Sequence, residues 1–139
     1  MHTTIATLQI TADLDELIQV RQFVETTIVP YISDQQTLSD IVLAVDEAVT
    51  NIIRHGYQQK KPGSIEITIR CEQNQIEIKL SDWSPNFDPT QVTSPNPNTP
   101  LSRRKPGGMG VYMMRQLTDE MQYCQLPDGR NELTLIKQI

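Results

Sequence analysis

Two neighbouring segments of strict alternation constrain the fold of this chain most strongly. Residues 65–71 alternate between apolar and polar side chains, and residues 76–80 do the same after the short link Glu72–Asn74. A period of two is typical of a strand with one buried face, and the short link suits a hairpin. The apolar positions are Ile65, Ile67, Ile69, Cys71, Ile76, Ile78 and Leu80. The pair therefore predicts an antiparallel hairpin that needs a second layer against its apolar face.

Two helical patterns precede this hairpin and can supply that layer. Residues 12–29 carry apolar side chains three and four apart, with Thr11 as the expected cap and Pro30 as the stop. A second helix is expected from about Asp34 to His55, ended by Gly56. The expected buried positions are Leu14, Leu17, Val20, Phe23, Val24 and Ile28 in the first helix, and Leu38, Ile41, Val42, Val45, Ala48, Val49 and Ile52 in the second.

Shorter elements are expected at both ends of the chain. Residues 3–10 suit a half-buried strand, and a short helix is expected from near Gly108 to about Leu117. Strands around 121–125 and 131–137 should flank a turn at Pro127–Gly129. The pattern predicts an α+β fold, a two-layer sandwich of a mixed, mostly antiparallel sheet with helices on one face. The length of 139 residues favours a single domain.

Composition excludes several classes of protein. With 37% hydrophobic and 21% charged residues, the chain is not collagen-like, wholly disordered or a disulfide scaffold. The net charge of −5 is the wrong sign for general nucleic-acid binding, and residues 1–53 hold eight acids against one arginine. No apolar run is long enough for a membrane span, and no export segment or zinc-ligand spacing occurs. We therefore expect a cytoplasmic domain with no membrane or direct nucleic-acid partner.

A proline-rich segment interrupts the pattern between Trp83 and Pro106. It holds six of the nine prolines and ends in the cationic run Arg103–Lys105, directly before Gly107–Gly110. A connection of this length inside a compact domain is either a solvated, disordered loop or a functional lid. The second interpretation is a mobile basic flap, at about residues 83–107, against a glycine-rich helix start.

A polar stripe borders the apolar face of the second expected helix. Glu47, Asn51 and His55 recur every four residues, so they share one helix face. A carboxylate there could act as a general base, and an amide oxygen one turn along could ligate Mg²⁺. The alternative is that these are ordinary exposed residues, with His55 interacting with the helix dipole. Taken alone, the stripe leaves both interpretations open.

Two further signals follow along the chain. Asp82 stands at the end of an expected strand, where a carboxylate can accept a hydrogen bond from an exocyclic amine. Gly107–Gly110 admits close backbone approach and opens a helix whose free N–H groups suit a phosphate. The chain contains no Walker A loop, and the glycines do not follow the first strand as a Rossmann fingerprint requires.

The order of these signals resembles the GHKL ATPase superfamily with its Bergerat fold, and within it the small bacterial anti-sigma-factor serine/threonine kinases. Val45–Tyr57 is similar to the family's N box, and Asp82–Pro89 to its first glycine box. Gly107–Val111 is similar to the second glycine box. The resemblance covers nearly the whole chain, and the ordered set of boxes is far more specific than any one of them.

The resemblance implies a role for each matching residue, with ATP and Mg²⁺ as ligands. Asn51 would hold Mg²⁺ against the phosphates, Glu47 would take a proton from a serine on the partner protein, and Asp82 would accept the adenine amino group. Gly108 and Gly110 would let the lid close over the phosphates. The resemblance also places these residues at the nucleotide: His55, Ser84, Arg104, Lys105 and Met109.

Three positions depart from the family pattern or remain open. Ser84 replaces a glycine that normally lies close to adenine, which implies weakened binding at most. Pro106 stands where some kinases carry an arginine, with Arg104 and Lys105 the nearest cations. The polar residue expected near adenine in the last strand is either Asn131 or Thr134.

The resemblance implies two alternative functions. The first is a kinase that sequesters a sigma factor or similar regulator, phosphorylates a serine of a STAS-domain antagonist and forms a homodimer. The second is a nucleotide-sensing binding module of the same fold that transfers phosphate weakly or not at all.

Overall fold

The computed structural model describes residues 3–58, 63–85, 88–89 and 108–139, with only the backbone of residues 108–110. Five strands form one sheet in the order β1-β2-β3-β5-β4. Their bounds are β1 Thr4–Thr11, β2 Ser64–Cys71, β3 Gln75–Asp82, β4 Glu120–Gln125 and β5 Asn131–Gln138. The predicted hairpin of β2 and β3 is confirmed, as is the turn between β4 and β5.

Every strand pairing in the sheet is antiparallel, although we expected a mixed sheet. The chain topology explains the difference. β3 and β4 run in the same direction, but β5 lies between them and runs opposite to both. Strands that run in the same direction are therefore never hydrogen-bonded neighbours in this sheet.

The helices follow the expected order with shifted ends. α1 spans Leu17–Ile28, α2 spans Gln35–Asn51 and α3 spans Gly108–Leu117. Short 3₁₀ helices at Leu14–Glu16 and Val29–Tyr31 flank α1, and a π-helix at Ile52–Gly56 continues α2. The second expected helix is thus confirmed over its full length, but its last turn changes type.

The expected cap at Thr11 is wrong. Thr11 is the last residue of β1, and its hydroxyl donates to Glu16 Oε1 at 3.1 Å. Asp13 caps the first turn instead, because its carboxylate accepts the N–H of Asp15 at 2.9 Å. Pro30 lies inside the second 3₁₀ helix, so α1 ends two residues before it.

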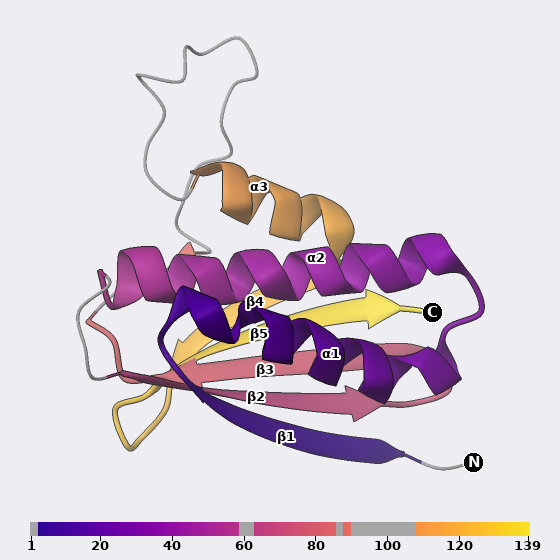
Figure 1. Cartoon of the computed structure of the whole chain (residues 1–139), viewed down its shortest axis with the longest axis horizontal. Helices are drawn as coiled ribbons and strands as arrows, with labels where there is room; N and C mark the ends of the chain where they lie inside the picture. The colour runs from indigo at the N-terminus through magenta and orange to yellow at the C-terminus, as the bar shows by residue number, and fades with distance from the viewer. Residues whose placement is uncertain (1–2, 59–62, 86–87, 90–107) are drawn as a thin grey trace, which may run out of the picture.

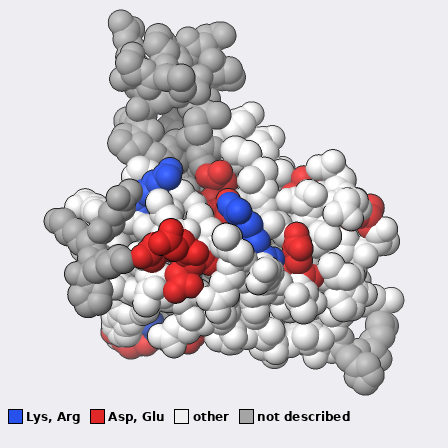
Figure 2. Space-filling view, viewed as in Figure 1, with Lys and Arg blue, Asp and Glu red and all other residues white. Residues whose placement is uncertain are grey.

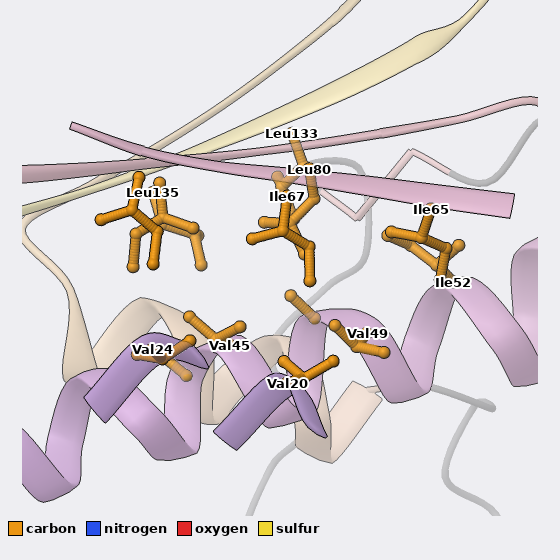
Figure 3. Packing of buried hydrophobic residues seen from close by; sticks show 14 of the residues in the cluster. Val20, Val24, Val45, Val49, Ile52, Ile65, Ile67, Leu80, Leu133 and Leu135 are labelled. Carbon is orange, nitrogen blue, oxygen red and sulfur yellow. The ribbon is translucent and has the colours of Figure 1, made fainter. Parts of the chain in front are cut away.

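The helices form a single layer on one face of the sheet (Figure 1), with α2 between α1 and α3. Valines of α1 and α2 pack against isoleucines and leucines of β2, β3 and β5 (Figure 3). Most of the predicted helix positions are buried, while Leu14, Leu17, Phe23, Leu38 and Val42 are partly buried at the edge of this core. The fold class is therefore confirmed as an α+β sandwich with helices on one face.

The helix face of the molecule carries more acidic than basic side chains (Figure 2), as the composition of residues 1–53 predicts. Arg21 of α1 pairs with Asp46 of α2 at 3.0 Å, and its exposure limits what that pair contributes to stability. No described helix combines the length and the apolar character that crossing a membrane requires.

Candidate functional site

Two polar residues occupy core-facing positions at one end of the sheet. Asp82 ends β3 in the same phase as Ile78 and Leu80, and Asn131 begins β5 in the same phase as Leu133. These two polar residues are direct partners in the strand register. Their side chains therefore project toward the helix layer, where they are 5% and 3% exposed.

One oxygen of Asp82 is the centre of a buried hydrogen-bond network. Asp82 Oδ1 accepts the backbone N–H of Ser84 at 2.8 Å, the hydroxyl of Ser84 at 2.5 Å and the amide of Asn131 at 3.1 Å. The same amide nitrogen of Asn131 donates to the carbonyl oxygen of Ser84 at 2.8 Å. The bonds fold the chain after β3 back onto the strand end and fix the orientation of the carboxylate.

Ser84 is accommodated by a glycine at the end of the helix. A Cβ atom on Gly56 would lie 2.6 Å from Ser84 Oγ and 3.1 Å from Ser84 Cβ. The serine side chain points toward Asp82 and Gly56, and it does not line the pocket described below. The placement of Ser84 near adenine, which the resemblance implies, stays a prediction.

The π-helix docks the end of α2 onto β3. Its wider turn is closed by the N–H of Tyr57 bonding to the carbonyl of Ile52 at 2.8 Å. The Tyr57 hydroxyl then donates to the carbonyl of Ser64 at 2.7 Å and accepts the N–H of Trp83 at 2.8 Å. Burial raises the pKa of Tyr57, which keeps the hydroxyl in its donor form.

A narrow pocket opens between this end of the sheet and the helices. Its lining residues come from both layers: Ala48, Asn51, Ile52, Asp82, Pro89, Met114, Tyr123 and Leu133. Its volume of about 10 Å³ is close to that of a single water molecule. A ring the size of a nucleobase therefore requires side chains of the pocket to move apart.

Asn51 lines this pocket. Its nitrogen donates to the backbone carbonyl of Glu47 at 2.8 Å, so the amide oxygen is the atom that could bind a ligand. An amide oxygen suits a hard cation such as Mg²⁺. The described residues hold no cluster of three acidic, histidine or cysteine ligands, so a cation here would draw most of its ligands from phosphate and water.

Neither Glu47 nor His55 lines the pocket. Glu47 is half-buried one helical turn before Asn51, and burial, with the neighbouring Asp46, raises the pKa of its carboxyl. His55 belongs to the π-helix, and burial, with the neighbouring Arg54, lowers the pKa of its ring. The structure thus brings Asn51 together with Asp82, and Glu47 beside them.

The glycine segment begins α3, as predicted. Gly108 is the first residue of α3, which lies beside α2 (Figure 1), and Val111 and Met114 are fully buried under it. The side chain of Met109 is not among those described. Arg104, Lys105 and almost all of the expected lid at 83–107 lie outside the described residues.

The strand register places Asn131 and Thr134 on opposite faces of the sheet. Asn131 lies opposite Asp82 on the helix-facing side, whereas Thr134 is out of phase with it and lies opposite Lys79 and Gln122. Sequence reasoning missed Tyr123, which lines the pocket and whose hydroxyl donates to Asn131 Oδ1 at 2.9 Å. Alternation within β4 could have placed it on the buried face, but not next to Asn131, because that contact depends on strand order.

Asn51 of α2 and Asp82 of β3 line one pocket. The resemblance to GHKL ATPases implies this arrangement. The sequence pattern of the family described as "Histidine kinase-like ATPase domain" matches residues 10–137. The chain belongs to this family, so the family predicted from the sequence is confirmed.

Two curated relatives carry more specific names. The chain is 35% identical over 95 residues to "Serine/threonine-protein kinase BtrW" of Bordetella bronchiseptica, covering 68% of this chain and 66% of that protein. It is 32% identical over 88 residues to "Serine-protein kinase RsbW" of Bacillus subtilis, covering 60% of this chain and 55% of that protein. The matched segments thus span between half and two thirds of these relatives.

A solved structure has the same fold. The crystal structure of the RsbU and RsbW domains of a Mycobacterium tuberculosis protein matches 95% of this chain and 32% of that chain, with a TM-score of 0.64. The sequence identity is 19%, so this likeness supports the architecture alone.

Proposed function

We propose that the chain is an ATP-dependent serine/threonine protein kinase of the partner-switching, anti-sigma-factor type. The observation that carries this proposal is that Asn51 of α2 and Asp82 of β3 line one pocket in a member of the histidine kinase-like ATPase domain family. A carboxylate for an amine and an amide oxygen for a cation are the two recognition groups that Mg-ATP needs at its opposite ends.

The adenine end of the nucleotide lies at the strand ends. Asp82 accepts the adenine amino group, and the apolar side chains of Ile52, Met114 and Leu133 contact the ring. Ser84 contributes by holding Asp82 rather than by touching the base. The small volume of the pocket implies that the nucleotide enters as the side chains above it move.

The phosphate end lies between α2 and the start of α3. Asn51 would hold Mg²⁺ through its amide oxygen, and the ion would neutralise part of the phosphate charge. The free N–H groups at Gly108 and Gly110 face the anionic oxygens at the helix N-terminus. Arg104, Lys105, Met109 and His55 complete the set of residues that we assign to the nucleotide.

Glu47 is the general base for phosphoryl transfer. Its raised pKa, caused by burial and by Asp46, makes the carboxylate a better proton acceptor than an exposed glutamate. Glu47 takes the proton of the serine hydroxyl, the serine oxygen forms the new bond to the γ-phosphorus, and the bond to the leaving ADP oxygen breaks. The other residues act by positioning and charge stabilisation.

The substrate is a serine on a STAS-domain antagonist, and the sequestered partner is a sigma factor or similar regulator. The two curated relatives are named as a serine/threonine-protein kinase and a serine-protein kinase, which supports serine as the residue that accepts phosphate. We also assign residues 1–139 to one ATP-binding kinase domain that acts as a homodimer.

The proposal is tested with labelled Mg-ATP and candidate STAS domains. Glu47→Gln should bind ATP normally but label the partner at least about 100 times more slowly, because the base is lost. Asn51→Ala should lose Mg-dependent binding. Glu120→Gln, which changes an exposed acid on β4, is the matched control and should label at the normal rate.

The outcomes separate two functions. Full labelling by Glu47→Gln would remove that residue as the base. Tight ATP binding without labelling of any STAS domain would favour the alternative function, a nucleotide-sensing binding module. The sequence feature that favours this alternative is Pro106, which stands where some kinases carry an arginine.

A further inference from the structure

We propose that Tyr123, acting through Asn131, is a positioning residue that makes Asp82 present a single acceptor oxygen to the base and so select adenine over 6-oxopurines. The inference rests on the proposed nucleotide site. It concerns a residue of β4, a strand that contributes none of the three family boxes.

The carboxylate of Asp82 has one oxygen already in use. Oδ1 accepts three hydrogen bonds from Ser84 and Asn131. Among the described residues, none donates to the other oxygen, Oδ2, although Asp82 lines the pocket. An ionised carboxylate only accepts hydrogen bonds, so Oδ2 is the atom left for a donor on the base.

Asn131 is held in one orientation from both ends. Its nitrogen donates to Asp82 Oδ1 and to the carbonyl of Ser84, while its oxygen accepts the Tyr123 hydroxyl at 2.9 Å. Asn131 is 3% exposed, so this amide has little access to water as an alternative partner. Loss of the tyrosine hydroxyl would leave a buried oxygen without its donor, which loosens the Asn131 amide and weakens its hold on Asp82.

Tyr123 is suited to this role in two ways. Its side chain lines the pocket, so the residue that steers Asn131 also contacts the space that receives the base. Burial, with the nearby carboxylates of Asp88 and Asp82, raises the pKa of its hydroxyl. The hydroxyl therefore stays protonated and remains a donor across the physiological range.

The chemical consequence is selectivity at the 6-position of the purine. The 6-amino group of adenine donates to Oδ2, whereas the 6-oxo group of hypoxanthine would place a second acceptor against it. A site with a fixed acceptor rejects such an analogue more strongly than a site whose carboxylate can turn away.

The experiment measures the affinities of Mg-ADP and Mg-IDP by calorimetry and by the fluorescence of Trp83, the single tryptophan, which adjoins Asp82. Tyr123→Phe keeps the ring and removes the hydroxyl. It should lower the ratio of ADP to IDP affinity about tenfold, which is the scale of one buried hydrogen bond. Tyr31→Phe, which removes a hydroxyl bonded to Thr4 of β1 at the opposite edge of the sheet, is the matched control and should leave the ratio unchanged.

A second variant tests the route through Asn131. Asn131→Leu should lower the same ratio, and adding Tyr123→Phe to it should cause no further loss if the hydroxyl acts through the amide. Circular dichroism and thermal melting check that each variant is folded.

A purely structural role would weaken the binding of both nucleotides equally, and an unchanged ratio in Tyr123→Phe overturns the inference. These results differ from failure of the proposed function, in which the folded wild-type chain would bind neither nucleotide.

Discussion

The two ends of the helix-facing side of the sheet have the same backbone and opposite chemistry. At one end, Ile69 and Ile76 share an apolar core with the valines of α1 and α2. At the other end, Asp82 and Asn131 stand in the same alternating phase and are buried to the same degree. The candidate site therefore lies where the inward-facing positions of β3 and β5 continue but hold polar instead of apolar side chains.

The difference between the two ends shows what burial of polar groups requires. Every side-chain nitrogen and oxygen that is sealed from solvent in the described part of the chain has a hydrogen-bond partner. At the polar end those partners are other site residues, so Asp82, Ser84, Asn131 and Tyr123 support one another. The apolar end supplies stability, whereas the polar end supplies one oriented acceptor.

The largest effect is expected from a cavity at the apolar end. Ile69→Ala should lower the free energy of unfolding by about 2–5 kcal/mol, because Ile69 is fully buried between the sheet and the helices. Urea denaturation measures the loss, and ADP affinity of the remaining folded protein should be unchanged. A large loss of affinity in the folded fraction would mean that the two ends are not separable.

Asp82→Asn, at the polar end, should weaken ADP binding and leave stability almost unchanged. The amide oxygen should replace Oδ1 and keep its three donors, which turns the amide nitrogen toward the pocket and against the adenine amine. Binding of ADP should weaken at least about 100-fold with little change in stability. Glu77→Gln, on the other face of β3, is the matched control for calorimetry, and equal affinities of the two variants would contradict the assigned role.

The sequence predicted the apolar end of the sheet more completely than the polar end. Alternation and helical spacing predicted the buried isoleucines and valines, because each of those patterns is local. The convergence of Asn51 with Asp82 was predicted only through the resemblance. The contact of Tyr123 with Asn131 was not predicted, because it depends on β4 and β5 pairing in a particular register.

The π-helix was also missed, for a different reason. Nothing in the spacing of Ile52–Gly56 distinguishes a π turn from an α turn, since the same residues can close either hydrogen bond. The wider turn is accompanied by the contact of Gly56 with Ser84 and by the bonds of Tyr57. These are tertiary contacts, and a local pattern does not contain them.

The contact between Gly56 and Ser84 gives the next prediction. Gly56→Ala should destabilise the fold by about 1–3 kcal/mol, because the added Cβ would lie 2.6 Å from Ser84 Oγ. Ser84→Gly should relieve most of that loss in the double variant, as measured by urea denaturation. Additive losses in the double variant would show that the two residues do not compete for this space.

The smallest effect concerns pH and His55. Burial and Arg54 lower the pKa of this histidine, so the folded state favours the neutral ring. The stability that this provides is present above the unfolded pKa of about 6.5 and is lost as the pH falls through the lower folded value. His55→Gln should therefore reduce the loss of stability between about pH 7.5 and 5.5.

Arg54→Gln serves as the matched variant, because it removes only the second cause of the shift. Arg54→Gln should also reduce the loss of stability at low pH, but by less than His55→Gln does. A steeper loss of stability in His55→Gln than in the wild type would contradict the direction of the shift.

The most direct test of the account is a calorimetric titration of the folded wild-type chain with ADP, with and without Mg²⁺. The account predicts binding of one ADP per chain that tightens when Mg²⁺ is present, and loss of that tightening in Asn51→Ala. No binding of ADP to the folded wild-type chain in the presence of Mg²⁺ would contradict the claim that Asn51 and Asp82 serve one nucleotide.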